Sequence, residues 1–162
     1  MNFTSSRKLA LPLIFVLCQP VFSAPVSLSD LRVGTISIRQ SEASVVQGLG
    51  EPDYRAVTGY GLVLSYPDLA VGMTSSGGRV RQLETSSSRQ CLPSKVCPKT
   101  PISGAIRAYG RPTEDRRGDP QNSSDETGMR YIKYLTQDKN CSLFLPAKHG
   151  VIQSILIECD DY

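Results

Sequence analysis

The sequence predicts an α+β fold in which two tandem repeats, each a short helix packed on an antiparallel β-meander, form one compact body. A short apolar helical pattern stops at a Gly-x-Pro sequence twice, at 50–52 and, sixty residues later, at 110–112. β-rich sequence follows each stop and closes on a similar strand, at 80–83 and at 152–155. Internal duplication is therefore the expected principle of the fold.

Residues 1–23 have the features of a signal peptide. Arg7 and Lys8 form a positive start, and the apolar run 9–17 is too short to cross a bilayer. No other segment is long and apolar enough, so we expect no integral membrane span. The chain is expected in the periplasm or secreted.

Signal-peptide cleavage is expected after Ser23, because Val21 and Ser23 suit the −3 and −1 positions of the processing site. A lipoprotein is the alternative, with Cys18 as the modified residue. The bulky Leu17 before that cysteine disfavours it, since lipidation normally requires a small residue there.

Composition limits the function classes. The formal net charge is +3, and removal of the two cations Arg7 and Lys8 leaves +1. This near-neutral balance gives no support for binding to nucleic acid or to a membrane surface. A processed chain of about 139 residues suits one domain or two small repeats that share a core.

Four cysteines remain after the signal peptide, which in an exported chain indicates two disulfides with three possible pairings. Cys141 and Cys159 are equidistant from Gly150, so a hairpin turning there places them opposite each other. Cys91–Cys97 then closes a short loop. A metal site at the latter pair is disfavoured, because no histidine lies near it.

The first repeat is predicted over 24–88, beginning with an extended lead-in. Ser41 is expected to cap a helix that runs to Leu49 and ends at Gly50. The strands expected to follow it lie at 54–57, 62–66, 70–74 and 79–85. A disulfide-looped linker, 89–99, leads to the second repeat.

The second repeat is predicted over 100–162, with Thr100 as helix cap and Pro101 in the first helical position. Its apolar face has helical spacing and consists of Ile102, Ala105, Ile106 and Tyr109. Strands are expected at 129–136, 141–145 and 151–159, after a long charged loop at 113–128.

The hairpin register divides the second repeat into two faces. The face expected to pack on the helices is apolar and contains Cys141, Leu143, Leu145, Ile155, Ile157 and Cys159. The opposite face is mixed and contains Ser142, Phe144, Ile152, Ser154, Leu156 and Glu158. A mixed face is typical of a half-solvated antiparallel sheet or of a binding surface.

This unit of helix, Gly-x-Pro stop and meander resembles the tandem repeats of the β-lactamase inhibitory proteins and the related domain of the SmpA/OmlA outer-membrane assembly lipoproteins. The resemblance covers roughly residues 36–159. It is carried by Val46, Leu49, Gly50 and Pro52, then by Ile106, Tyr109, Gly110 and Pro112, and by the strands after each group. It implies a concave sheet that presents its surface and turns to a protein partner. The sequence lacks a convincing lipidation motif, and no contact residue of the inhibitors can be carried over.

Catalytic patterns are missing from the sequence. The single histidine, His149, lies in a predicted turn and is interpreted as exposed rather than as a catalytic base. No nucleophile elbow, phosphate loop or zinc-protease motif occurs. The sequence therefore predicts a protein that is not an enzyme and has no cofactor or metal.

The expected function is an exported protein-binding module that presents a sheet face and hairpin turns to an envelope or secreted protein, as an enzyme inhibitor or an envelope-assembly factor. Candidate binding residues are Tyr60, at a predicted hairpin tip, Tyr131, Phe144 and His149. Core packing is the alternative role for Tyr60. The alternative function is a small-molecule or glycan-binding periplasmic module.

Overall fold

The computed structural model of the chain describes residues 25–59, 61–75, 78–117 and 128–160. In chain order its helices are η1 (Leu28–Asp30), α1 (Glu42–Leu49) and α2 (Ile102–Tyr109). Its strands are β1 (Arg32–Val33), β2 (Ile36–Ser37), β3 (Tyr54–Thr58), β4 (Gly61–Tyr66), β5 (Leu69–Met73), β6 (Val80–Thr85), β7 (Glu114–Arg117), β8 (Met129–Leu135), β9 (Cys141–Lys148), β10 (Val151–Ile152) and β11 (Ile155–Cys159). The predicted signal peptide and Tyr60 lie outside the described residues.

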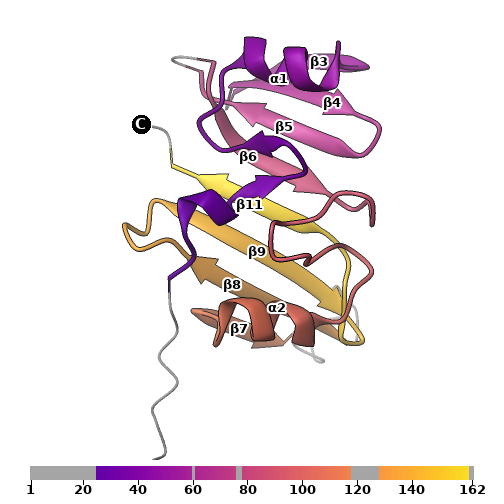
Figure 1. Cartoon of the computed structure of the whole chain (residues 1–162), viewed down its shortest axis with the longest axis vertical. Helices are drawn as coiled ribbons and strands as arrows, with labels where there is room; N and C mark the ends of the chain where they lie inside the picture. The colour runs from indigo at the N-terminus through magenta and orange to yellow at the C-terminus, as the bar shows by residue number, and fades with distance from the viewer. Residues whose placement is uncertain (1–24, 60, 76–77, 118–127, 161–162) are drawn as a thin grey trace, which may run out of the picture.

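The predicted α+β class with two helix-plus-meander repeats is wrong. Strands account for 46% and helices for 15% of the described residues, and nine strands form one large antiparallel sheet. The order across the sheet is β3-β4-β5-β6-β11-β9-β8-β7, with β10 paired to β9 (Figure 1). The physical reason is that β6 and β11 pair with each other, with Leu83 opposite Ile157 on the buried face. Two separate meanders would have left these strand edges unpaired.

The first helix follows the sequence expectation. The side chain of Ser41 accepts a hydrogen bond from the backbone N–H of Ser44, and Gly50, at a φ of 84°, ends the helix. The N–H of Gly50 donates to the carbonyl of Val46 over 2.8 Å. The sequence therefore specifies both ends of α1 locally.

The start of the second helix differs from the prediction. Pro101 is the residue before α2, and no side chain caps the helix. The hydroxyl of Thr100 instead donates to the carbonyl of Cys97 over 2.6 Å. The hydroxyl that was expected to cap the helix thus bonds within the disulfide loop that precedes it.

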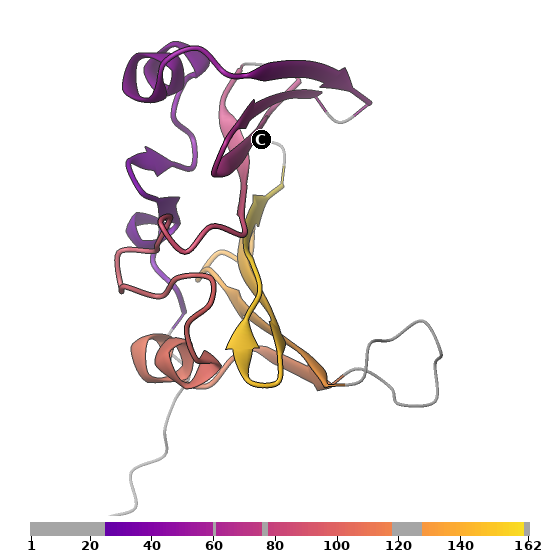
Figure 2. The same cartoon turned by 90° about the vertical axis from the view of Figure 1, so that its right-hand side faces the viewer.

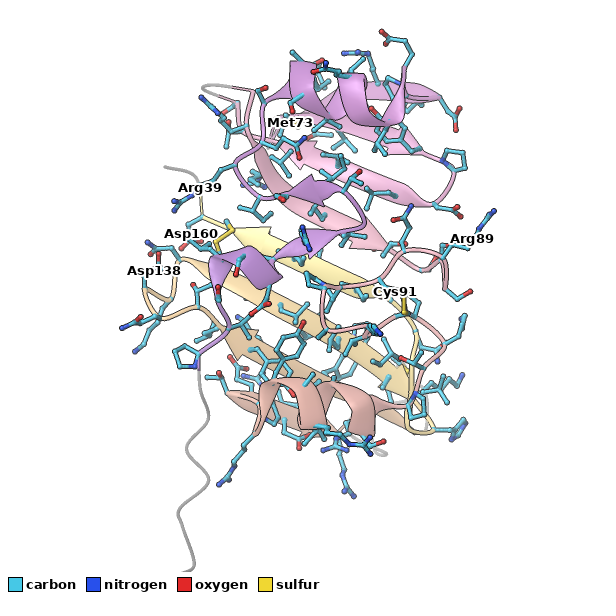
Figure 3. All side chains as sticks on the ribbon, in the orientation of Figure 1. Arg39, Met73, Arg89, Cys91, Asp138 and Asp160 are labelled. Atoms are coloured by element: carbon cyan, nitrogen blue, oxygen red, sulfur yellow. A yellow bond between two sulfur atoms is a disulfide. The ribbon has the colours of Figure 1, made fainter. Side chains whose placement is uncertain are left out.

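Both expected disulfides are present (Figure 3). Cys141 and Cys159 are opposite each other on β9 and β11, with their Cα atoms 4.0 Å apart. The six residues assigned to the apolar face are all buried. The assignment of Ile152 to the mixed face is wrong, because Ile152 pairs with Ala147 and is fully buried. The break between β10 and β11 at 153–154 shifts the alternation and turns Ile152 toward the core.

The charged segment predicted as a loop at 113–128 contributes an edge strand instead. Residues 114–117 pair with β8, so that Asp115 lies opposite Ile132. Asp115 also accepts two hydrogen bonds from the guanidinium of Arg130, at 2.8 and 2.7 Å. These charged contacts stabilise a strand that has no apolar alternation to predict it.

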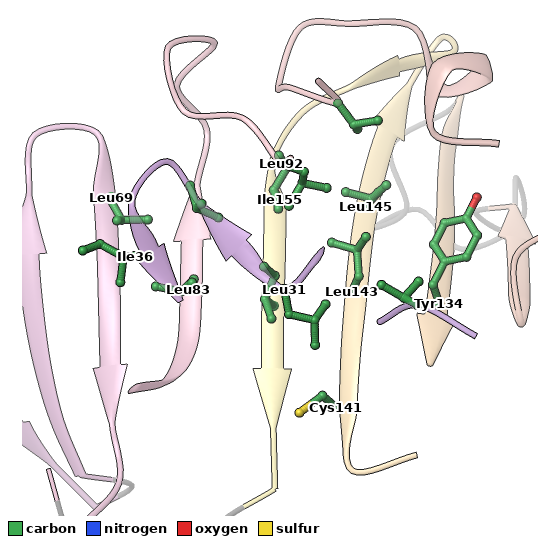
Figure 4. Packing of buried hydrophobic residues seen from close by; sticks show 14 of the residues in the cluster. Leu31, Ile36, Leu69, Leu83, Leu92, Tyr134, Cys141, Leu143, Leu145 and Ile155 are labelled. Atoms are coloured by element: carbon green, nitrogen blue, oxygen red, sulfur yellow. The ribbon is translucent and has the colours of Figure 1, made fainter. Parts of the chain in front are cut away.

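The N-terminal segment, residues 26–38, is more structured than the extended lead-in that the sequence predicts. It forms η1 and the β1–β2 hairpin and lies across the sheet on the same side as the helices (Figures 1 and 2). Leu31, Val33 and Ile36 are at most 1% exposed. Figure 4 shows Leu31 and Ile36 among the buried side chains of the sheet. The segment is thus an integral part of the core.

Two buried tyrosines connect α2 with the sheet. The rings of Tyr109 and Tyr134 are 5.5 Å apart, and the hydroxyl of Tyr134 donates to the carbonyl of Gly110 over 3.2 Å. Burial raises the pKa of Tyr134 from 10.0 to about 12. The phenol is therefore held in its neutral form well into the alkaline range.

Replacing Cys141 and Cys159 together by alanine should lower the free energy of unfolding by about 3 kcal/mol in the chain-entropy model, because their loop is the longer one. The matched Cys91→Ala/Cys97→Ala variant should lose about 2 kcal/mol. Urea unfolding of both variants measures the difference. A larger loss for the second variant would contradict this ordering.

Leu31→Ala should destabilise the protein by about 2–5 kcal/mol, because it removes a fully buried side chain from the N-terminal segment. Leu28→Ala is the control on the same segment, since Leu28 is 40% exposed and should cost less than about 1 kcal/mol. Equal thermal stabilities of the two variants would show that the segment is not part of the core.

Stability should fall as the pH rises from 10 toward 12. In that window an unfolded chain loses the phenolic proton of Tyr134 while the folded chain keeps it, so the free energy of unfolding decreases by about 1.4 kcal/mol per pH unit. Tyr134→Phe should remove this one-proton contribution from the pH dependence of urea unfolding. An unchanged slope in the variant would refute the assignment.

Candidate binding face

One face of the large sheet is left uncovered by the other elements that the structure describes. Both helices and the N-terminal segment lie on the opposite side (Figure 2). The two ends of the sheet bend away from the helices, so that the uncovered face is concave (Figure 2). We call this surface the open face. Its shape suits a convex partner.

The strand register gives the side chains that lie in line across the open face. One row crosses eight strands through directly paired residues: Tyr54, Ser65, Ala70, Glu84, Leu156, Phe144, Lys133 and Glu114. Seven strand spacings of about 4.8 Å make this row roughly 34 Å wide. The row therefore has the width of a protein interface.

Two aromatic side chains stack in the part of this face formed by β8 and β9. The rings of Tyr131 and Phe144 are 5.8 Å apart and inclined by 13°. Leu156 lies opposite Phe144 on β11, and all three residues are half-buried. Stacked rings have little conformational freedom, so they form a rigid apolar area.

Charged side chains border the aromatic pair on its β7 side. The carboxylate of Glu114 lies 2.9 Å from the guanidinium of Arg116 and 3.9 Å from the ammonium of Lys133. One carboxylate is thus shared by two cations, and this border carries a net positive charge.

A hollow of about 570 Å³ opens between these groups. Residues of β7, β8, β9 and β11 line it: Glu114, Arg116, Tyr131, Lys133, Ser142, Phe144, Leu156 and Glu158. A second hollow of about 530 Å³ shares Glu158 and continues along β4, β5 and β6. The open face is therefore hollowed on both sides of the β6–β11 pairing.

The structure brings together two of the four candidate residues. Tyr131 and Phe144 stack on the open face, whereas His149 lies apart in the turn after β9, with a φ of 50° and its ring next to Gly128. Tyr60 cannot be placed, because it is outside the described residues.

Sequence reasoning missed the charged part of the site. Lys133 was detectable, because it follows Tyr131 by two residues on one strand and must share its face. Glu114 and Arg116 gave no such signal, since the segment Glu114–Arg117 has no apolar alternation.

In the described ranges, no group of three or more histidine, cysteine, aspartate or glutamate side chains could hold a metal ion. None of the helices described is long and apolar enough to cross a membrane. No family model, curated protein or solved structure matches the chain. The resemblance to the inhibitory proteins and assembly lipoproteins thus stays a prediction.

Proposed function

We propose that the protein is an exported, non-enzymatic binding module whose open face captures an envelope or secreted protein. The observation that carries this proposal is the stacked pair Tyr131 and Phe144, half-buried in an uncovered concave sheet. Rigid aromatic side chains of this kind are frequent binding hot spots. Inhibition of an enzyme and scaffolding of envelope assembly are the two forms of this function.

Export is supported by the cysteines. All four cysteines of the described part are joined in two disulfides, which is compatible with an oxidising extracellular compartment. The signal-peptide features of residues 1–23 support the same conclusion.

A protein partner is favoured over a small molecule by the extent of the face. A row about 34 Å wide can contribute the roughly 800 Å² per partner that stable protein interfaces bury. A glycan or small molecule would fill the hollow beside Phe144 and leave the β3–β5 part of the row unused. This alternative predicts binding to a glycan array in place of a stoichiometric protein complex.

The Phe144→Ala/Tyr131→Ala double variant should bind its partner at least about tenfold more weakly, because both rings are removed from the centre of the contact. Partner capture from a periplasmic extract, quantified against the native chain, measures this. Leu28→Ala is the matched control, since it removes an exposed apolar side chain from the helix side and should leave capture unchanged. Unchanged capture by the double variant, with native thermal stability, would refute the open face as the binding surface.

A further inference from the structure

We infer that the partner presents to the open face a protruding loop with an apolar or aromatic residue between a basic and an acidic side chain. This inference rests on the proposed function and specifies the chemistry of the partner. It follows from how charge and apolar surface alternate along the row that crosses the sheet.

The β6–β11 side of the aromatic pair is acidic, because among the described residues it carries Glu84 and Glu158 against one cation, Arg81, which lines a hollow together with Glu158. Glu84 lies opposite Leu156, and Glu158 lies two residues further along β11 on the same face. Both side chains are exposed, and neither forms an ion pair with any residue in the described part of the chain. An apolar partner covering these carboxylates would leave them desolvated without compensation. A basic group on the partner removes that cost.

The β7–β8 side of the pair is basic. Arg116 and Lys133 share the carboxylate of Glu114, and the side chain of Arg116 is 77% exposed. Lys133 is 3.9 Å from that carboxylate, so its ammonium retains capacity for another anion. An acidic group on the partner would complete this arrangement with a second carboxylate.

The middle of the row is apolar. Leu156 and Phe144 separate Glu84 from Lys133, so the two charges are three strand spacings apart, or roughly 14 Å. An extended segment rises about 3.3 Å per residue, so its basic and acidic residues should be about four positions apart. An apolar side chain between them then lies over Phe144. A concave face admits such a segment most readily as a protruding loop.

Partners with charge of a single sign fit this face poorly. A polyanion such as a nucleic acid would be attracted by Arg116 and Lys133 but repelled by Glu84 and Glu158. A uniformly basic surface would be attracted by Glu84 and Glu158 but repelled by Arg116 and Lys133. The opposite charges on either side of one apolar centre therefore determine both the composition and the orientation of the loop.

A phage-displayed library of disulfide-closed loops with seven randomised positions tests the inference, with the full processed chain as immobilised target. We expect the enriched loops to carry Lys or Arg and Asp or Glu about four positions apart, with an apolar or aromatic residue between them. Their affinity should fall at least tenfold on the Phe144→Ala variant.

Charge reversals give the decisive comparison for one enriched loop made as a synthetic cyclic peptide. Lys133→Glu and Glu84→Lys should each weaken binding about tenfold, whereas Arg107→Glu on the exposed side of α2 should leave it unchanged. A ligand of a single charge sign would instead bind one reversal variant more tightly.

The outcomes separate this inference from the proposed function. Loops of one charge sign that still depend on Phe144 would overturn the inference and leave the binding face intact. Enriched loops indifferent to Phe144→Ala and Tyr131→Ala would contradict both. Absence of any enriched loop would overturn the inference alone, because the partner would then not present a loop.

Discussion

The pairing of β6 with β11 is the interaction on which the rest of the structure depends. Four directly paired positions, from Ile155–Thr85 to Glu158–Gln82, join two groups of strands that are far apart in the sequence. Without this contact each group would expose an unpaired edge, and edges of that kind favour aggregation. With β6 and β11 paired, β3 and β7 are the strands at the two ends of the sheet. The latter is protected by four charged residues in succession, Glu114–Arg117.

The same pairing explains why the N-terminal segment is needed. A nine-stranded sheet has a long apolar face, and two helices of eight residues each cannot cover it. The segment covers the remaining area with Leu31, Val33 and Ile36. Its backbone is fixed at both ends, since Val26 donates to the carbonyl of Leu135 and Arg39 to that of Val80. With one face covered in this way, the other remains open.

The sequence predicted what is local in this fold and missed what is long-range. The capping hydroxyl of Ser41 and the glycine at position 50 act within a few residues, so they mark α1 reliably. The Cys141–Cys159 register follows from symmetry about one turn, and it placed Leu143 and Ile157 on the core face. No local pattern shows that β6 pairs with β11, so the repeated sequence pattern predicts two meanders where the structure has one sheet.

The candidate site also has a part that local sequence patterns predict and a part that depends on long-range strand pairing. Phe144 and Tyr131 were found because they are aromatic residues on strands whose alternation is clear. The charged residues on either side of this pair were not predicted. The acidic ones come from β6 and β11 and the basic ones from β7 and β8, and these strands are far apart in the sequence. Only the assembled sheet places Glu84 in line with Lys133.

The polarity of the open face is thus a consequence of sheet topology. Glu84 belongs to the first group of strands, whereas Leu156, Phe144 and Lys133 belong to the second, so the order along this row needs both groups. The Cys141–Cys159 disulfide fixes β9 to β11 at the end of the pairing that aligns them. Because these strands are held by ladder hydrogen bonds, the backbone positions of Glu84 and Lys133 keep a constant spacing. In the proposed function, binding would not have to order the strands of the site, and selectivity would follow from the spacing of the two charged positions.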